Sequence, residues 1–206
     1  ALFMGFAPEK HRANLSKLLD SELAQTGGKL RTGFVGTAYL NRVLSNNGLN
    51  RRAYQLLLNE EYPGWLYEVN LGATTVWERW NSLLPDGSIS DTGMNSLNHY
   101  AYGAIMEWVY RDAAGLNPVE SAPGFKKALI EPKPDYLLPK VSVRYNSAMG
   151  WYLSAWEIKK DLFVWDVEIP FGAQAILVFP NGDRAALAKA YPALAVEDSP
   201  EGKIGR

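Results

Sequence analysis

Residues 72–80 read Gly72-Ala73-Thr74-Thr75-Val76-Trp77-Glu78-Arg79-Trp80 and place one carboxylate, Glu78, between two tryptophans. Indole rings stack on the C–H faces of a pyranose, and a carboxylate between them can manage protons or water. This pattern is therefore typical of a sugar-cleaving site. The same alternation also describes a half-buried strand whose Glu78 faces solvent, and the spacing alone leaves both interpretations open.

Polar side chains crowd a second segment, residues 93–103, which reads Gly93-Met94-Asn95-Ser96-Leu97-Asn98-His99-Tyr100-Ala101-Tyr102-Gly103. Most of these side chains can donate or accept hydrogen bonds, and His99 is one of only two histidines in the chain. Two further segments accompany it, Thr32-Gly33-Phe34-Val35-Gly36-Thr37 and Tyr62-Pro63-Gly64-Trp65-Leu66-Tyr67-Glu68. Together with residues 72–80, these segments resemble the C-terminal portion of bacterial α-L-rhamnosidases.

The resemblance implies a fold and an activity. Members of that family are inverting glycoside hydrolases built on an (α/α)6 barrel followed by a β-sandwich. Such hydrolysis needs two carboxyl groups, one that protonates the leaving oxygen and one that deprotonates the attacking water. By the resemblance, Glu78 is the general base and His99 contacts the rhamnose hydroxyls. Trp65, Trp77 and Trp80 cluster in sequence around this acid, and we expect them to line the sugar site, with core packing as the alternative.

The general acid is missing from this pattern. In the resembled family it lies upstream, in a barrel segment rich in aspartate, arginine and glycine, and no such segment occurs here. The candidates within the chain are Glu68 and the pair Glu60-Glu61 at a helix end. We interpret Glu68 as a surface acid of a hairpin. The chain is therefore expected to hold half of an active site and to be nearly inactive alone.

Composition excludes several other classes of function. The chain has 206 residues, 47% of them hydrophobic, and a formal net charge of −1. This balance gives no electrostatic drive toward nucleic acid or an anionic membrane, and no apolar run is long enough to span a bilayer. The absence of cysteine excludes disulfides and thiolate metal sites, and two histidines make a histidine-based zinc site improbable. We expect no metal and no cofactor, and the cellular compartment stays open.

Hydrophobic periodicity divides the chain into two parts. Helical spacing predicts helices over residues 8–25, 36–46, 51–60 and 96–114, with Asn50 as a cap and a short strand hairpin formed by residues 65–69 and 74–80. Beyond a proline-rich transition, period-two alternation predicts strands over residues 141–145, 151–156, 162–169 and 174–179. The expected fold is a two-part α+β chain: helical hairpins of a partial (α/α)6 barrel, residues 1–117, then an antiparallel β-sandwich, residues 118–206.

The helix count has a consequence for partners. Periodicity indicates roughly four helices, far fewer than the six hairpins of a complete (α/α)6 barrel require. We therefore expect a missing N-terminal barrel portion, and an exposed apolar surface that favours self-association. The expected partner is a rhamnose-containing glycoside. The alternative is a non-catalytic fragment, either structural or a β-sandwich that binds carbohydrate through Trp151, Trp156 or Trp165.

Overall fold

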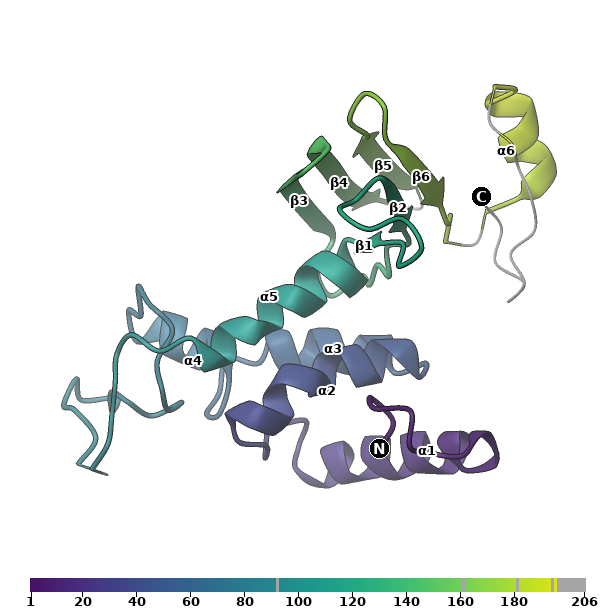
Figure 1. Cartoon of the computed structure of the whole chain (residues 1–206). Coiled ribbons are helices and arrows are strands. Elements are labelled where there is room, and N and C mark those ends of the chain that lie inside the picture. Colours follow the sequence, from purple (N-terminus) through teal and green to yellow (C-terminus); the bar gives the residue numbers. More distant parts are fainter. Residues whose placement is uncertain (92, 161, 181, 194, 196–206) are drawn as a thin grey trace. The chain divides into compact units, whose positions relative to one another are not determined.

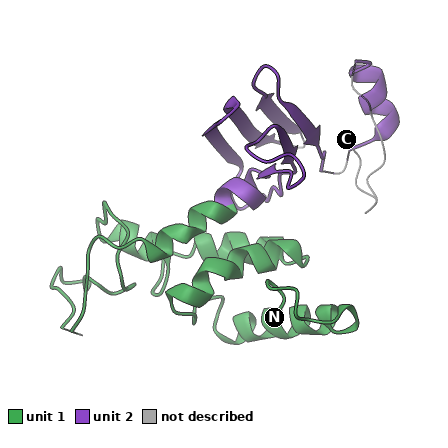
Figure 2. Ribbon diagram, viewed as in Figure 1, with its two compact units in different colours: residues 1–108 green, residues 109–206 purple. Residues whose placement is uncertain are grey.

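The computed structural model describes residues 1–91, 93–160, 162–180, 182–193 and 195. The chain forms two compact units, residues 1–108 and residues 109–206 (Figure 2). The first unit is helical and the second holds all the strands of the described residues (Figure 1). The α+β order of helices followed by sheets, predicted from periodicity, is confirmed.

Unit 1 is built on short helices. Its elements are α1 (Glu9–Gln25), α2 (Phe34–Asn46), α3 (Asn50–Leu57), α4 (Trp65–Asn70), the 3₁₀-helix η1 (Ala101–Ala104) and α5 (Ile105–Trp108). The predictions of α1, α2 and α3 are confirmed to within a few residues. Asn50 is not the cap of α3 but its first residue, and its side-chain oxygen accepts a hydrogen bond from Ser45.

The core of unit 1 lies between α2, α3 and α5. Trp108 is buried, donates from Nε1 to Ser45 Oγ at 2.7 Å, and meets the Tyr54 ring edge-on at 4.9 Å. Asn41 donates to the backbone oxygen of Ala53 and ties α2 to α3. Because the polar atoms of these aromatic side chains find partners, large rings can fill the interior without an unpaired donor. The prediction that Trp108 belongs to the core is confirmed.

The predicted hairpin of residues 65–69 and 74–80 is wrong. Residues 65–70 form the helix α4, and residues 71–80 form an irregular loop. Five alternating residues also fit a helix turn, in which Trp65 and Glu68 at positions i and i+3 share one face. The loop pairs with residues 94–99 instead, so helical structure begins at Ala101 and not at residue 96.

Unit 2 contains two three-stranded sheets. It begins with the π-helix η2 (Val109–Ala113), and the strands are β1 (Leu116–Pro118), β2 (Lys127–Ile130), β3 (Lys140–Ser147), β4 (Gly150–Lys159), β5 (Leu162–Glu168) and β6 (Gln174–Leu177), followed by α6 (Arg184–Ala190). The sheet orders are β1-β2-β6 and β3-β4-β5. The second sheet is antiparallel, as predicted, whereas β6 crosses over to pair parallel with β2. Strands β1 and β2 lie in or beside the proline-rich transition, where periodicity is too short to reveal them.

Alternation along β4 decides which aromatic rings form the core of unit 2. Tyr152, Ser154 and Trp156 are buried, whereas Trp151 is 54% exposed. Tyr152 donates to the backbone oxygen of Phe125, and Trp156 Nε1 donates to that of Ala113. Period-two alternation therefore places the larger share of the β4 aromatic surface inside the unit.

Candidate functional site

Two loops of unit 1 pair with each other around Glu78 and His99, and we call residues 73–82 and 94–99 the paired loops. The N–H of Glu78 donates to the backbone oxygen of Ser96 at 2.9 Å, and the N–H of His99 donates to that of Val76 at 2.7 Å. Side chains extend the pairing, with donation from Thr75 Oγ1 to Leu97, from Arg79 Nε to Met94 and from Asn95 Nδ2 to Ser82. The structure thus brings together the two segments that the sequence singled out.

Glu78 lies in the middle of this pairing. Its backbone is fixed by the bond to Ser96, while its side chain is half-buried and keeps part of its surface in water. A carboxylate that must accept a proton from water needs this combination of a fixed backbone and solvent access. Arg79, the next residue, is engaged with the backbone of Met94.

His99 has a defined hydrogen-bond pattern on one ring nitrogen. Its Nδ1 accepts from the N–H of Ala101 at 3.3 Å, so the neutral imidazole carries its proton on Nε2. The ring stacks on Tyr100 at 4.9 Å and lies 5.9 Å from the ring of Phe34. Since Nδ1 is occupied, Nε2–H is the donor that His99 can offer to a hydroxyl group.

The three tryptophans expected at the sugar site are unequally exposed. Trp77 is 2% exposed and Trp80 is 6% exposed, whereas Trp65 is half-buried. Trp80 stacks on Tyr102 at 3.6 Å and meets Trp65 edge-on at 5.2 Å. Trp65 Nε1 donates to the backbone oxygen of Tyr102. These contacts show that Trp65, Trp80 and Tyr102 form a packed cluster that includes Trp80 of the paired loops. Contact with a sugar stays a prediction for all three tryptophans.

Glu68 departs most from expectation, because the interpretation as a surface acid is wrong. The residue lies on α4 and is 4% exposed. Burial raises the pKa of its carboxyl group to about 7, opposed in part by a hydrogen bond from the backbone of Trp77. Its Oε1 and the Nε1 of Trp80 are buried and have no hydrogen-bond partner within the described residues.

Tyr102 completes this buried group and was missed as a functional candidate. The pKa of its phenol is raised, first by burial and then by the neighbouring Glu68 and Tyr62, while Arg79 opposes the rise. The helical spacing of Trp65 and Glu68 was the signal in the sequence that could have placed Glu68 inside, beside the motif that contains Tyr102.

The other acid candidates do not suit proton donation. Glu60 and Glu61 are both exposed, and Glu61 pairs with Lys29 Nζ at 2.6 Å. The hydrogen bond and the charge of Lys29 lower the pKa of Glu61, which favours its ionised form. A general acid needs the opposite environment.

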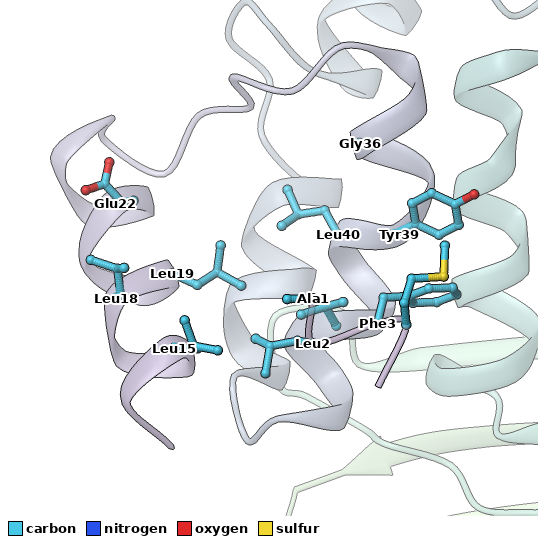
Figure 3. Close-up of a pocket in the computed structure, with 12 residues that line it drawn as sticks. Ala1, Leu2, Phe3, Leu15, Leu18, Leu19, Glu22, Gly36, Tyr39 and Leu40 are labelled. Carbon is cyan, nitrogen blue, oxygen red and sulfur yellow. The ribbon is translucent and has the colours of Figure 1, made fainter. Parts of the chain in front are cut away.

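An apolar groove of about 450 Å³ lies elsewhere in unit 1 (Figure 3). It is bordered by the first four residues of the chain and by side chains of α1 and α2, among them Leu18, Tyr39 and Leu40. Glu22 is the only carboxylate that lines it. Since a glycosidase site needs two carboxyl groups and hydroxyl-binding partners, this groove is not the catalytic site.

Comparison with known proteins decides the family. Residues 1–113 match the bacterial alpha-L-rhamnosidase 6 hairpin glycosidase domain, and residues 115–190 match the bacterial alpha-L-rhamnosidase C-terminal domain. The chain belongs to the bacterial α-L-rhamnosidase family. The helices of unit 1 are accordingly part of a six-hairpin domain, and the sheets of unit 2 are the C-terminal domain of this family.

Relatives of this chain within the family are much longer than it is. The chain is 38% identical to an α-L-rhamnosidase of Formosa agariphila over 91% of its length, and 39% identical to one of an Alteromonas species over 87%. It superposes on the crystal structure of Streptomyces avermitilis α-L-rhamnosidase complexed with L-rhamnose with a TM-score of 0.85, at 29% identity and 99% coverage. The chain spans about a fifth of the length of each of these three proteins: 20%, 19% and 19%, respectively.

Two further features are absent from the described part of the chain. It holds no group of three or more histidine, cysteine, aspartate or glutamate side chains able to bind a metal ion. None of its helices combines the length and apolar character needed to cross a membrane.

Proposed function

We propose that this chain is the C-terminal part of an inverting α-L-rhamnosidase that hydrolyses terminal α-L-rhamnosyl residues. In this proposal it comprises a partial (α/α)6 barrel, residues 1–117, and a C-terminal β-sandwich, residues 118–206. It carries the general base, Glu78, but not the general acid. The observation that carries the proposal is the pairing of the two loops, which joins the backbone of Glu78 to the segment of His99.

Each side chain of the paired loops has a distinct task in this proposal. The Glu78 carboxylate takes a proton from the water that attacks the anomeric carbon, and the configuration there inverts. The Nε2–H of His99 donates to a rhamnose hydroxyl, because its Nδ1 is already occupied by Ala101. Trp65, with its half-buried ring, offers an apolar surface to the sugar. Trp77 and Trp80 support this region from the interior and are retained as predicted contacts.

The environments of the chain's own acids do not suit a general acid. Lys29 pairs with Glu61 and favours its ionised form, and Glu68 is 4% exposed, so a leaving-group oxygen has no access to its carboxyl group. We therefore place the acid in a barrel portion upstream of these residues, which also completes the sugar site. The relatives, about five times longer than the part matched here, have room for such a portion.

Titration of the folded chain with L-rhamnose, followed by NMR of the indole and imidazole signals, tests this function. We expect saturable shifts that start at His99 and Trp65, and we expect them to vanish in His99→Ala. Glu78→Gln should keep binding, weakened at most severalfold, because the base acts on water. Shifts that survive in His99→Ala would contradict the proposal.

The matched control is Trp151→Ala, since Trp151 is the most exposed aromatic ring of β4 and carries the guanidinium of Arg144 above it. Loss of binding in this variant alone would instead support a carbohydrate-binding β-sandwich. A folded chain that binds no rhamnose would support a structural fragment.

Self-association is a separate expectation. The apolar groove of Figure 3 and the exposed side chains of Phe3, Met4 and Leu18 beside it provide the surface on which it rests. Sedimentation velocity at increasing chain concentration measures it. A monomer at every concentration would contradict it.

A further inference from the structure

We propose that Phe34 and Tyr100 are positioning residues for His99: their rings hold the imidazole in place, so that its Nε2–H is already ordered when a rhamnose hydroxyl arrives. The inference rests on the proposed role of His99 in binding rhamnose. It concerns two segments of unit 1 that stand out in the sequence, residues 32–37 and 93–103. The first of them has no task in the proposed reaction.

The imidazole of His99 contacts two aromatic rings. The Tyr100 ring stacks on it, with the ring centres 4.9 Å apart and an angle of 21° between the planes. The Phe34 ring meets it at 5.9 Å with an angle of 50°. Phe34 and Tyr100 make no ring contact with each other in the part of the chain that the structure describes. The imidazole is therefore the shared partner of both rings, and a change of its side-chain rotamer would break both contacts.

Hydrogen bonds fix the backbone and one edge of the same residue. The N–H of His99 donates to the backbone oxygen of Val76 at 2.7 Å, which ties the residue to the opposite strand of the paired loops. Its Nδ1 accepts from the N–H of Ala101 at 3.3 Å, whereas Nε2 has no hydrogen-bond partner among the described residues. The ring is thus held at its faces and at one nitrogen, and Nε2 is the polar atom left for a ligand.

The start of α2 fixes the place of Phe34, its first residue. The Thr37 hydroxyl oxygen lies 3.1 and 3.0 Å from the backbone oxygens of Thr32 and Gly33. It also lies 2.8 Å from the hydroxyl oxygen of Thr32. Helix α2 packs in addition against η1, which begins directly after Tyr100. The segment of residues 32–37 therefore brings the Phe34 ring to the end of the paired loops, although it lies more than sixty residues away in sequence.

Neither ring is placed by burial in the hydrophobic core. Tyr100 is 83% exposed and Phe34 is 42% exposed, so each keeps much of its surface in water while it contacts the imidazole. A His99 side chain without these contacts would have to be ordered during binding, and ordering one side chain at an interface weakens affinity by roughly fivefold. We expect a loss of this size for L-rhamnose when either ring is removed.

The test combines NMR of the His99 ring with L-rhamnose affinity in the folded chain. In the unaltered chain, the His99 ring protons should show nuclear Overhauser contacts to Phe34 and an upfield ring-current shift from Tyr100. Tyr100→Leu should remove this shift and weaken rhamnose binding roughly fivefold, with the urea midpoint unchanged because the side chain is exposed. Tyr100→Phe, which keeps the ring, should restore most of that affinity. Phe34→Leu should weaken binding to a similar extent.

The matched control is Tyr136→Leu. Tyr136 is 70% exposed in unit 2 and has no ring contact within the described residues, so its loss should leave the affinity and the His99 signals unchanged. Unchanged affinity in both Phe34→Leu and Tyr100→Leu overturns the proposal, and so does a loss in Tyr100→Leu that Tyr100→Phe fails to reverse. Absence of rhamnose binding in the unaltered chain would instead defeat the proposed function. In that event, a His99 ring shift that survives in Tyr100→Leu would still refute positioning by this ring.

Discussion

The aromatic cluster of unit 1 and the aromatic core of unit 2 use the same residue types in opposite ways. In unit 2 the buried rings are hydrogen-bonded, Tyr152 to the backbone oxygen of Phe125 and Trp156 to that of Ala113, and the half-buried Trp165 donates to Ser154. In unit 1, the cluster of Trp65, Trp77, Trp80, Tyr102 and Glu68 leaves Trp80 Nε1 and Glu68 Oε1 without partners among the described residues.

The two aromatic regions differ in how well their buried polar atoms are paired. A buried polar atom without a partner costs about 1–3 kcal/mol, so stable interiors avoid it. The core of unit 2 obeys this rule because its rings serve stability. The cluster of unit 1 breaks the rule next to the paired loops, where strained or poorly satisfied groups are expected to accumulate around a site. Tryptophan content alone would not have distinguished the two regions.

The largest effect that sharpens this comparison is the pH dependence of stability in unit 1. The pKa of Glu68 in the folded chain is about 7, above the ordinary value of 4.5. The stabilisation of the fold by protonated Glu68 is therefore complete below pH 4.5 and is lost as pH rises through 7. The loss amounts to about 3 kcal/mol in the free energy of unfolding. Urea denaturation at pH 4.5 and 8 measures it. Glu68→Gln should remove this difference, and a variant that keeps the full slope would contradict the burial of an ionisable Glu68.

A pair of matched substitutions compares the two aromatic regions directly. Trp156→Phe leaves the backbone oxygen of Ala113 without its donor and opens a small cavity, so it should destabilise unit 2 by about 2–3 kcal/mol. Trp80→Phe removes a donor that is already unpaired, so it should cost about 1 kcal/mol or less. Urea unfolding of each variant gives both values. Equal costs would show that Trp80 is as well satisfied as Trp156.

The smallest expected effect concerns the paired loops. Thr75→Val removes the hydroxyl that donates to the backbone oxygen of Leu97 and should destabilise the loops by about 0.5–1 kcal/mol. Thr74→Val is the control, because Thr74 is exposed beside it. Amide hydrogen exchange at Glu78 and His99 reports the local opening. Faster exchange in both variants alike would show that the Thr75 hydroxyl does not hold the loops together.

Periodicity predicts the long helices and strands of the chain but not the connection over residues 65–80. Long helical and period-two patterns gave α1, α2, β3, β4 and β5 within a few residues, since periodicity is strong over such lengths. The alternation within residues 65–80 predicts a hairpin, because five alternating residues do not distinguish a strand from a short helix. A hairpin would place Glu68 on the surface, whereas the helix α4 buries it.

The candidate site could be predicted as a set of segments but not as a geometry. The motifs around Glu78 and His99 were separately recognisable, and their backbone pairing was not, because it joins irregular loops that lack any periodicity. The crossover that makes β6 parallel to β2 was invisible for a similar reason: strand direction depends on which strand becomes the neighbour, and local alternation does not specify this.

Hydrolysis of an aryl α-L-rhamnoside by the isolated chain, under conditions where L-rhamnose binding is measured in parallel, tests the central claim most directly. The claim is that residues 1–206 hold the general base and sugar contacts of an α-L-rhamnosidase without its acid. We predict rhamnose binding with no turnover that depends on Glu78. Turnover that disappears in Glu78→Gln would contradict the claim, because the general acid would then lie within this chain.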